Sequence, residues 1–140
     1  MRAGSPIDFW KSDVAAKILL VEDHVTMRQA VRMVLEPEGF EVVEAADGKA
    51  ALDRVGRDRP DIVLLDLNIP GLSGLSVLEA LKKDPQTASV PVIVVSADDE
   101  NARRRVMELG ADGFFTKPFS PLALLETLER VRGGEDARGS

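Results

Sequence analysis

Short aliphatic runs alternate with longer amphipathic stretches along most of the chain. Most of the runs are uninterrupted by polar residues, which is typical of strands that are covered on both faces in a parallel sheet. The predicted strands are Ile18–Val21, Glu41–Ala45, Ile62–Asp66, Val92–Val95 and Gly113–Thr116.

The stretches between these strands repeat their apolar residues three or four positions apart, as amphipathic helices do. The predicted helices cover Val25–Leu35, Asp47 to about Val55, Ser73 or Gly74 through Leu81, Asp98 or Asp99 to near Leu109, and a last helix from Ser120-Pro121. The positions in the last helix that we expect to face the core are Leu122, Leu125, Leu128 and Val131.

This alternation predicts an α/β fold with five βα units and helices on both faces of the sheet. We expect a doubly wound, five-stranded parallel sheet with the strand order 2-1-3-4-5, as in flavodoxin-like folds. Residues 17–132 then form the domain, residues 1–16 an N-terminal extension and residues 133–140 a polar tail or linker. In such sheets ligands bind beyond the carboxyl ends of the strands, here between the first and third strands.

Composition narrows the possible partners. The chain has 140 residues and a net charge of −6, and it carries no basic stripe, so we expect no direct binding of nucleic acid. It has no cysteine and therefore no cysteine-based metal site or nucleophile. No apolar run approaches the roughly 20 residues that span a bilayer, and the first residues do not resemble a signal peptide. These features predict a cytoplasmic protein without a membrane segment.

Three carboxylates lie at the ends of the predicted first and third strands, which is the switch point where the strand order of the sheet reverses. Glu22 and Asp23 follow the first strand, and Asp66 closes the third. Clustered carboxylates repel one another, and a bound hard cation such as Mg²⁺ relieves this repulsion. We expect Asp23 and Asp66 to be ligands, Glu22 to act directly or through water, and the backbone carbonyl of Asn68 to supply another oxygen. Any one of these carboxylates alone would be read as an exposed loop residue.

Groups that suit a phosphoryl ligand follow the other two strand ends. Ser96 ends the fourth strand and can donate a hydrogen bond, while Ala97 is small enough to let a phosphoryl group approach the backbone. Lys117 follows the fifth strand and can supply positive charge to phosphoryl oxygens. A carboxylate held against a metal ion and a lysine can itself attack phosphorus, so Asp66 is the candidate nucleophile.

These residues together resemble the CheY-like receiver domain of two-component response regulators. The resemblance covers about residues 17–132 and rests on four motifs in their family order: Glu22-Asp23, Asp66-x-Asn68-x-Pro70-Gly71 with Gly74 beyond, Ser96-Ala97, and Thr116-Lys117-Pro118-Phe119. Each motif alone is weak, whereas all of them on the expected elements are specific.

The resemblance implies a role for each site residue. Asp66 accepts phosphate from a sensor histidine kinase or a histidine phosphotransfer protein in a phosphorelay, with Mg²⁺ held by Glu22 and Asp23. Lys117 binds the phosphoryl oxygens, with Asn68, Ser96 and Ala97 also at the phosphoryl-binding site, and the bond from Lys117 to Pro118 is cis. Ser96 and Phe114 form the switch that changes the surface of the fourth helix, fifth strand and last helix, which the output partner or domain contacts. The chain would not be an enzyme beyond phosphorylating and dephosphorylating itself at Asp66.

The residues leave several alternatives open. A degenerate receiver can act as a scaffold without phosphorylation. An aspartyl-phosphate phosphatase would need a carboxylate where Asn68 stands, and a flavodoxin-like carrier would not place carboxylates after its first strand. His24 is either a metal ligand or an exposed loop residue.

The sequence says less about which kinase the receiver would recognise and whether it would dimerise than about its site. Kinase specificity in this family lies around the first helix, where the residues that we expect to be exposed include Thr26, Arg28, Gln29, Arg32 and Pro37. Response regulators of the winged-helix class often dimerise through charge pairs on the surface of the fourth helix, fifth strand and last helix. Arg103 matches one of their basic positions, so a weak or phosphorylation-dependent homodimer stays open. The other charged positions of that class are occupied by Gly113, Ala123 and Thr127.

Overall fold

The computed structural model describes residues 16–97 and 100–132 of the chain. Its strands are β1 (Lys17–Val21), β2 (Glu41–Ala45), β3 (Ile62–Asp66), β4 (Val92–Ser96) and β5 (Gly113–Thr116). Its helices are α2 (Val25–Leu35), the 3₁₀ turn η1 (Glu36–Glu38), α3 (Gly48–Asp58), α4 (Gly74–Lys83), α5 (Glu100–Glu108) and α6 (Pro121–Arg132). The start of the fourth helix expected at Asp98 or Asp99, most of the expected extension 1–16 and the expected tail 133–140 lie outside the described residues.

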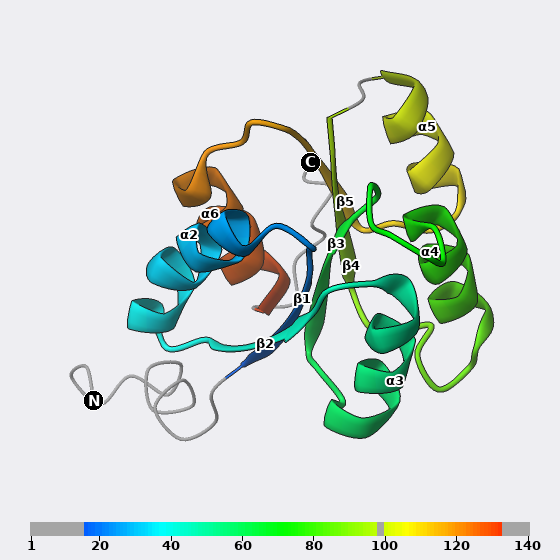
Figure 1. Cartoon of the computed structure of the whole chain (residues 1–140), viewed down its shortest axis with the longest axis horizontal. Coiled ribbons are helices and arrows are strands. Elements are labelled where there is room, and N and C mark those ends of the chain that lie inside the picture. Colours follow the sequence, from blue (N-terminus) through cyan, green and yellow to red (C-terminus); the bar gives the residue numbers. More distant parts are fainter. Residues whose placement is uncertain (1–15, 98–99, 133–140) are drawn as a thin grey trace.

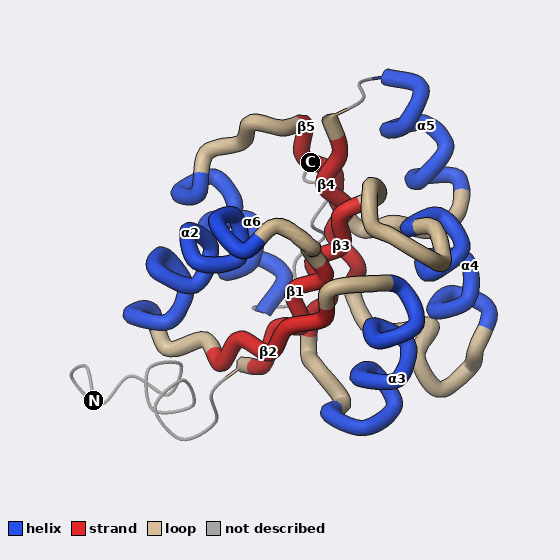
Figure 2. Tube along the Cα trace, in the orientation of Figure 1, coloured by secondary structure: helices blue, strands red, loops and turns tan. Residues whose placement is uncertain are grey.

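Within the described ranges, the strands form one parallel sheet in the order β2-β1-β3-β4-β5. Figure 1 shows α2 and α6 covering one face of the sheet and α3, α4 and α5 covering the other. The tube view makes the sheet visible as the central layer between the two sets of helices (Figure 2). The predicted fold class and strand order are therefore confirmed.

Burial on both faces explains the apolar runs. Leu19 and Val21 of β1 join the core cluster under α3, α4 and α5, whereas Ile18 and Leu20 join the cluster under α2 and α6. All four side chains are at most 3% exposed. The central strands β1, β3 and β4 therefore each contribute alternate residues to two separate cores, which leaves no polar face along their middle.

The expected core face of the last helix is partly wrong. Leu122 is 67% exposed, and the residue that occupies the core instead is Leu124, at 1%. Leu128 is buried as expected, and Thr127 is buried beside it. Leu122 lies two residues before Leu124, about 200° around the helix axis, so the two cannot face the same layer.

The helix after β2 is longer than predicted. It begins as expected, with the Asp47 carboxylate accepting a hydrogen bond from the Ala50 N–H. It continues past Val55 to Asp58, where the last turn contains an ion pair of 2.9 Å between Arg54 and Asp58. Arg59 then ends the helix in a left-handed conformation with φ of 50°.

Gly74 fixes the path of the chain beyond Asp66. A Cβ atom at this position would lie 2.5 Å from the Cα atom of Leu67 and 3.0 Å from the carbonyl oxygen of Asp66. Only glycine allows the first turn of α4 to lie this close to the backbone that follows β3. Ser73 caps the helix by accepting a hydrogen bond from the Ser76 N–H.

The corrected core face of α6 gives a direct stability test. We expect Leu128→Ala to lower the free energy of unfolding by about 2–5 kcal/mol, because it removes a fully buried side chain and leaves a cavity. Leu122→Ala, on the exposed side of the same helix, should change it by less than about 0.5 kcal/mol. Urea denaturation of both variants measures the difference, and equal losses would contradict this orientation of the helix.

Candidate functional site

The carboxyl ends of four strands bring the candidate residues to one edge of the sheet. Glu22 directly follows β1, Asp66 closes β3, Ser96 closes β4, and Lys117 directly follows β5. The Lys117 N–H donates a hydrogen bond of 2.8 Å to the Ser96 carbonyl, which continues the β4–β5 pairing beyond Thr116. This pairing aims the lysine side chain back across the end of β4 toward β3.

Asp66, at the end of β3, is as deeply buried as Glu22, which follows β1. Its side chain is 2% exposed. Its Oδ2 accepts a hydrogen bond of 2.8 Å from the Lys117 ammonium, and its Oδ1 accepts one of 3.0 Å from the Asn68 N–H. The carboxylate therefore has one oxygen facing a positive charge and one fixed by the turn that follows β3.

Glu22 shares the same ammonium group. Its Oε1 lies 3.4 Å from the Lys117 nitrogen, and its side chain is 3% exposed. Its Oε2 accepts a hydrogen bond of 3.1 Å from the His24 N–H and lies 2.8 Å from Nδ1 of the His24 ring. Lys117 thus lies between two nearly buried carboxylates.

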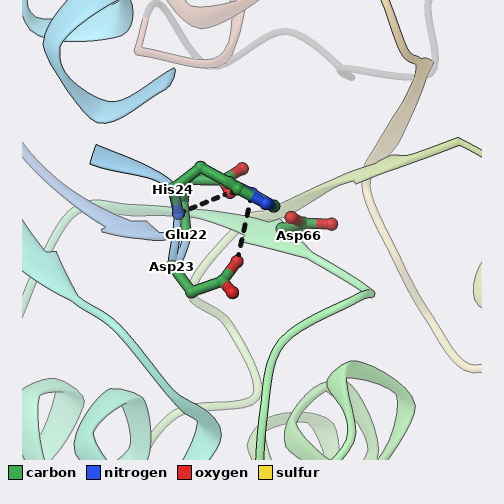
Figure 3. Close-up of side chains that lie close together, drawn as sticks. All are labelled: Glu22, Asp23, His24 and Asp66. Atoms are coloured by element: carbon green, nitrogen blue, oxygen red, sulfur yellow. Dashed lines mark hydrogen bonds and ion pairs between the residues drawn. The ribbon is translucent and has the colours of Figure 1, made fainter. Parts of the chain in front are cut away.

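Asp23 differs from its neighbours because one of its oxygens is unsatisfied. Its Oδ1 is buried and has no hydrogen-bond partner within the described parts of the chain. Nδ1 of the His24 ring lies 3.2 Å from this oxygen in an ion pair (Figure 3). A buried carboxylate oxygen without a partner is costly unless another group supplies positive charge.

The charges explain two shifted pKa values. Burial alone would lower the pKa of Lys117, but its hydrogen bond to Asp66 and the charges of Asp66 and Glu22 outweigh burial and raise that pKa. The hydrogen bond to Glu22, with the negative charge of Asp23, raises the pKa of His24. Both shifts favour the cationic forms, as expected beside carboxylates.

The cluster has the composition of a metal site. Glu22, Asp23, His24 and Asp66 can each offer a ligand atom, and these atoms all lie within 4.8 Å of one another. Figure 3 shows the three carboxylates and the His24 ring converging on this space. The His24 side chain is 68% exposed, so it lies on the rim. Three carboxylates and one imidazole include the oxygen donors that Mg²⁺ prefers.

The remaining predicted residues surround this cluster. Ser96 is 2% exposed, whereas Ala97 and Asn68 are on the surface. A cavity of about 190 Å³ opens beside them and is lined by Leu67, Asn68, Ser73, Leu75, Ser96, Asn101, Ala102 and Arg105. The peptide bond between Lys117 and Pro118 is cis. The metal-binding role of the Asn68 carbonyl stays a prediction.

Phe114 lies within β5, three residues before Lys117, and is half-buried. The guanidinium carbon of Arg103 lies 5.8 Å from the centre of its ring, within the range of a cation–π contact. This contact joins α5 to β5 and was not foreseen, because only the fold brings Arg103 opposite Phe114.

One expectation about the first helix is wrong. Arg28 is only 17% exposed, so it is not part of an open partner surface. Its guanidinium turns inward and donates a hydrogen bond of 2.7 Å to the Glu22 carbonyl. The sequence contains no signal for this contact beyond a basic residue one and a half turns after the acidic pair.

Residues 18–129 match the family model described as the response regulator receiver domain. The chain belongs to this receiver-domain family. The predicted resemblance is thereby confirmed, and the receiver is a signalling domain of two-component systems. Among the described helices, none combines the length and apolar character needed to cross a membrane.

Relatives and solved structures agree with this assignment. The chain is 41% identical over 119 residues to the phosphate regulon transcriptional regulatory protein PhoB of Klebsiella pneumoniae, covering 84% of this receiver and 52% of that protein. It is 43% identical over 122 residues to the sensory transduction protein RegX3 of Mycobacterium tuberculosis, covering 85% and 52%. The chain thus spans about half the length of these curated relatives.

Two crystal structures illustrate the shared fold. Chemotaxis protein CheY4 of Vibrio cholerae matches with a TM-score of 0.78 and 34% identity, over 84% of this receiver and 99% of that chain. The receiver domain of the sensor histidine kinase PA1611 of Pseudomonas aeruginosa matches with a TM-score of 0.78 and 29% identity, over 86% and 99%. That structure has a magnesium ion coordinated in its active site cleft.

The shared ammonium group makes a testable prediction for the metal-free receiver. We expect Lys117→Met to lower the free energy of unfolding by about 3 kcal/mol, because it leaves the charges of Asp66 and Glu22 buried without compensation. In an Asp66→Asn background the same change should cost clearly less. A double-mutant cycle measured by urea denaturation with EDTA tests this coupling, and equal costs in both backgrounds would contradict it.

Proposed function

We propose that this receiver accepts a phosphoryl group on Asp66 from a phosphohistidine of a sensor kinase or a phosphotransfer protein. The observation that carries the proposal is the Asp66 carboxylate, 2% exposed and held 2.8 Å from the Lys117 ammonium beside two further carboxylates. Such a buried, charge-paired carboxylate suits a nucleophile more than a structural ion pair, because it ends a strand at the switch point of the sheet.

The proposed step uses groups of this chain and of the donor. A carboxylate oxygen of Asp66 attacks phosphorus and forms a new P–O bond, giving an acyl phosphate. The P–N bond to the donor imidazole breaks, and its electron pair leaves with the imidazole nitrogen. Lys117 is placed to donate to the phosphoryl oxygens once they lie beside Asp66. Attack of water on the phosphorus of the acyl phosphate then releases inorganic phosphate and restores the Asp66 carboxylate.

The residues fit the divalent cation that the family implies. The unsatisfied Oδ1 of Asp23, beside Glu22 and Asp66, supports a site for positive charge. We propose that Asp23 and Asp66 hold Mg²⁺ with their carboxylates, Glu22 directly or through water, and Asn68 with its carbonyl. Bound Mg²⁺ would neutralise negative charge on the phosphoryl oxygens.

The output follows from the neighbouring strand ends. We propose that Ser96 donates its hydroxyl to the phosphoryl group, that Ala97 leaves space for it, and that Phe114 then turns into the space vacated near Ser96. This change alters the surface of α5, β5 and α6, which an output partner or domain reads. Thr127 is buried at 7% and so is not available for an outward charge pair, which supports at most a weak or phosphorylation-dependent homodimer on this surface.

The proposal extends to organisation and location. Residues 17–132 form the receiver, preceded by an extension and followed by a tail or linker, and we place the protein in the cytoplasm with its kinase. We expect this segment itself not to contact nucleic acid. PhoB is named as a transcriptional regulator, but the chain covers about half of it.

Phosphorylation of Asp66 is the central prediction. After incubation with Mg²⁺ and acetyl phosphate, the intact mass of the wild-type chain should increase by one phosphoryl group. The Asp66→Asn variant, which keeps the size of the side chain, should gain none. A gain in both proteins would place the acceptor elsewhere, and a gain in neither would favour the scaffold alternative.

The switch gives a second prediction. Ser96→Ala should still be phosphorylated on Asp66, because the nucleophile and Lys117 remain. The NMR signals of the Phe114 ring should shift on phosphorylation in the wild type and much less in Ser96→Ala, since the hydroxyl that is drawn to the phosphoryl group is absent. Equal shifts in both proteins would show that Ser96 does not link the acceptor to Phe114.

A further inference from the structure

Arg28 connects the turn that carries the acidic pair to the neighbouring edge strand. It lies on α2, and its side chain is 17% exposed. One guanidinium nitrogen donates a hydrogen bond of 2.7 Å to the Glu22 carbonyl, and Nε lies 3.0 Å from a carboxylate oxygen of Glu44 on β2. The planar guanidinium therefore has one edge on the strand and another on the backbone after β1.

The Glu22 carbonyl is an important acceptor because it lies between the two residues of the acidic pair. It belongs to the peptide unit between Glu22 and Asp23. Peptide units are planar, so holding this oxygen fixes the orientation of the unit. The Cα atoms at its two ends carry the two carboxylates of the acidic pair. Their directions toward Asp66 therefore depend on this one plane.

Asp23 depends on its backbone more than its neighbours do. The Oδ1 atom of Asp23 is buried without a hydrogen-bond partner in the described residues. The same oxygen lies 3.2 Å from Nδ1 of the His24 ring in an ion pair without hydrogen-bond geometry. Both carboxylate oxygens of Glu22, in contrast, accept hydrogen bonds, from His24 and from Lys117. The backbone plane that Arg28 holds therefore contributes more to the direction of the Asp23 carboxylate than to that of the Glu22 carboxylate.

We propose that Arg28 is a positioning residue for the divalent-cation site, acting through the Glu22–Asp23 peptide unit. The proposal rests on the proposed function, since it concerns the affinity of the same site for Mg²⁺. Groups that orient metal ligands from the surrounding shell commonly change metal affinity by about tenfold or more when they are removed.

A simpler role for Arg28 predicts the opposite sign. If Arg28 acted only as a positive charge near the cluster, it would repel Mg²⁺, and its removal would strengthen Mg²⁺ binding. If Arg28 holds the peptide unit, its removal weakens Mg²⁺ binding. The sign of the change in affinity therefore separates orientation from charge.

Arg32 provides a matched control on the same helix. It lies one turn after Arg28, contacts the same Glu44 carboxylate at 2.8 Å, and donates to the Val42 carbonyl at 3.2 Å. Its hydrogen bonds and ion pairs are with Glu44, Val42 and Glu36, so none reaches the acidic pair. Arg32→Met therefore removes a comparable link between helix and strand while leaving the peptide unit of interest untouched.

The test measures Mg²⁺ affinity by isothermal titration calorimetry. We expect Arg28→Met to raise the Kd for Mg²⁺ about tenfold, and Arg32→Met to change it less than about twofold. With phosphoramidate as donor, the Mg²⁺ concentration for half-maximal labelling of Asp66 should rise in parallel for Arg28→Met. The labelling rate at saturating Mg²⁺ should stay near that of the wild type, which a general loss of structure would not allow.

Arg28→Lys keeps the question decidable if Arg28→Met does not fold. Lysine retains the charge but not the forked donor that reaches two partners. A pure charge effect then predicts the wild-type Kd, whereas positioning predicts a Kd clearly above that of the wild type.

Two results overturn the proposal: a folded Arg28 variant with an unchanged or lower Kd, or an equal rise in Arg32→Met. Failure of the proposed function is distinct, because wild-type protein would then not be labelled even at saturating Mg²⁺.

Discussion

Burial of like charges at one edge of the sheet is the constraint on which the site depends. Glu22 directly follows β1 and Asp66 closes the neighbouring β3, and each residue is 2% exposed. Within the described residues, Lys117 is the cation bonded to both carboxylates, and its raised pKa reflects that role. Lys117 reaches them only because β5 pairs with β4, whose end also carries Ser96. Strand order, and not local sequence, therefore joins the parts of the site.

The cores on both faces of the sheet hold these carboxylates in place despite their mutual repulsion. The middle of each central strand is covered on both faces, so the strands are rigid where they are apolar and carry polar groups only where they end. Close packing resists the small rotations that would relieve repulsion between carboxylates. The unsatisfied oxygen of Asp23 is the remaining cost. A protein that keeps such an atom beside two other carboxylates is organised for an added positive charge.

The sequence was sufficient to predict what topology decides. Apolar runs located the strands, and the rule for doubly wound sheets placed Glu22, Asp66, Ser96 and Lys117 at one edge. Orientation around a helix was less predictable. Periodicity alone allowed Leu122 to be assigned to the core in place of Leu124, because the first turn of a helix carries few neighbours that identify its inner side. The direction of Arg28 was missed because a long cationic side chain can lie along either face of a helix.

The contacts on the two sides of the site differ in kind. On the β2 side, Arg28 and Arg32 tie α2 to Glu44 at 3.0 and 2.8 Å. On the β5 side, the contact from Arg103 on α5 is to the face of the Phe114 ring, at 5.8 Å. A cation–π contact near the surface contributes about 0.5–1 kcal/mol, and it can re-form at several ring positions. Phe114 also has no hydroxyl through which a hydrogen bond could anchor its ring in one position.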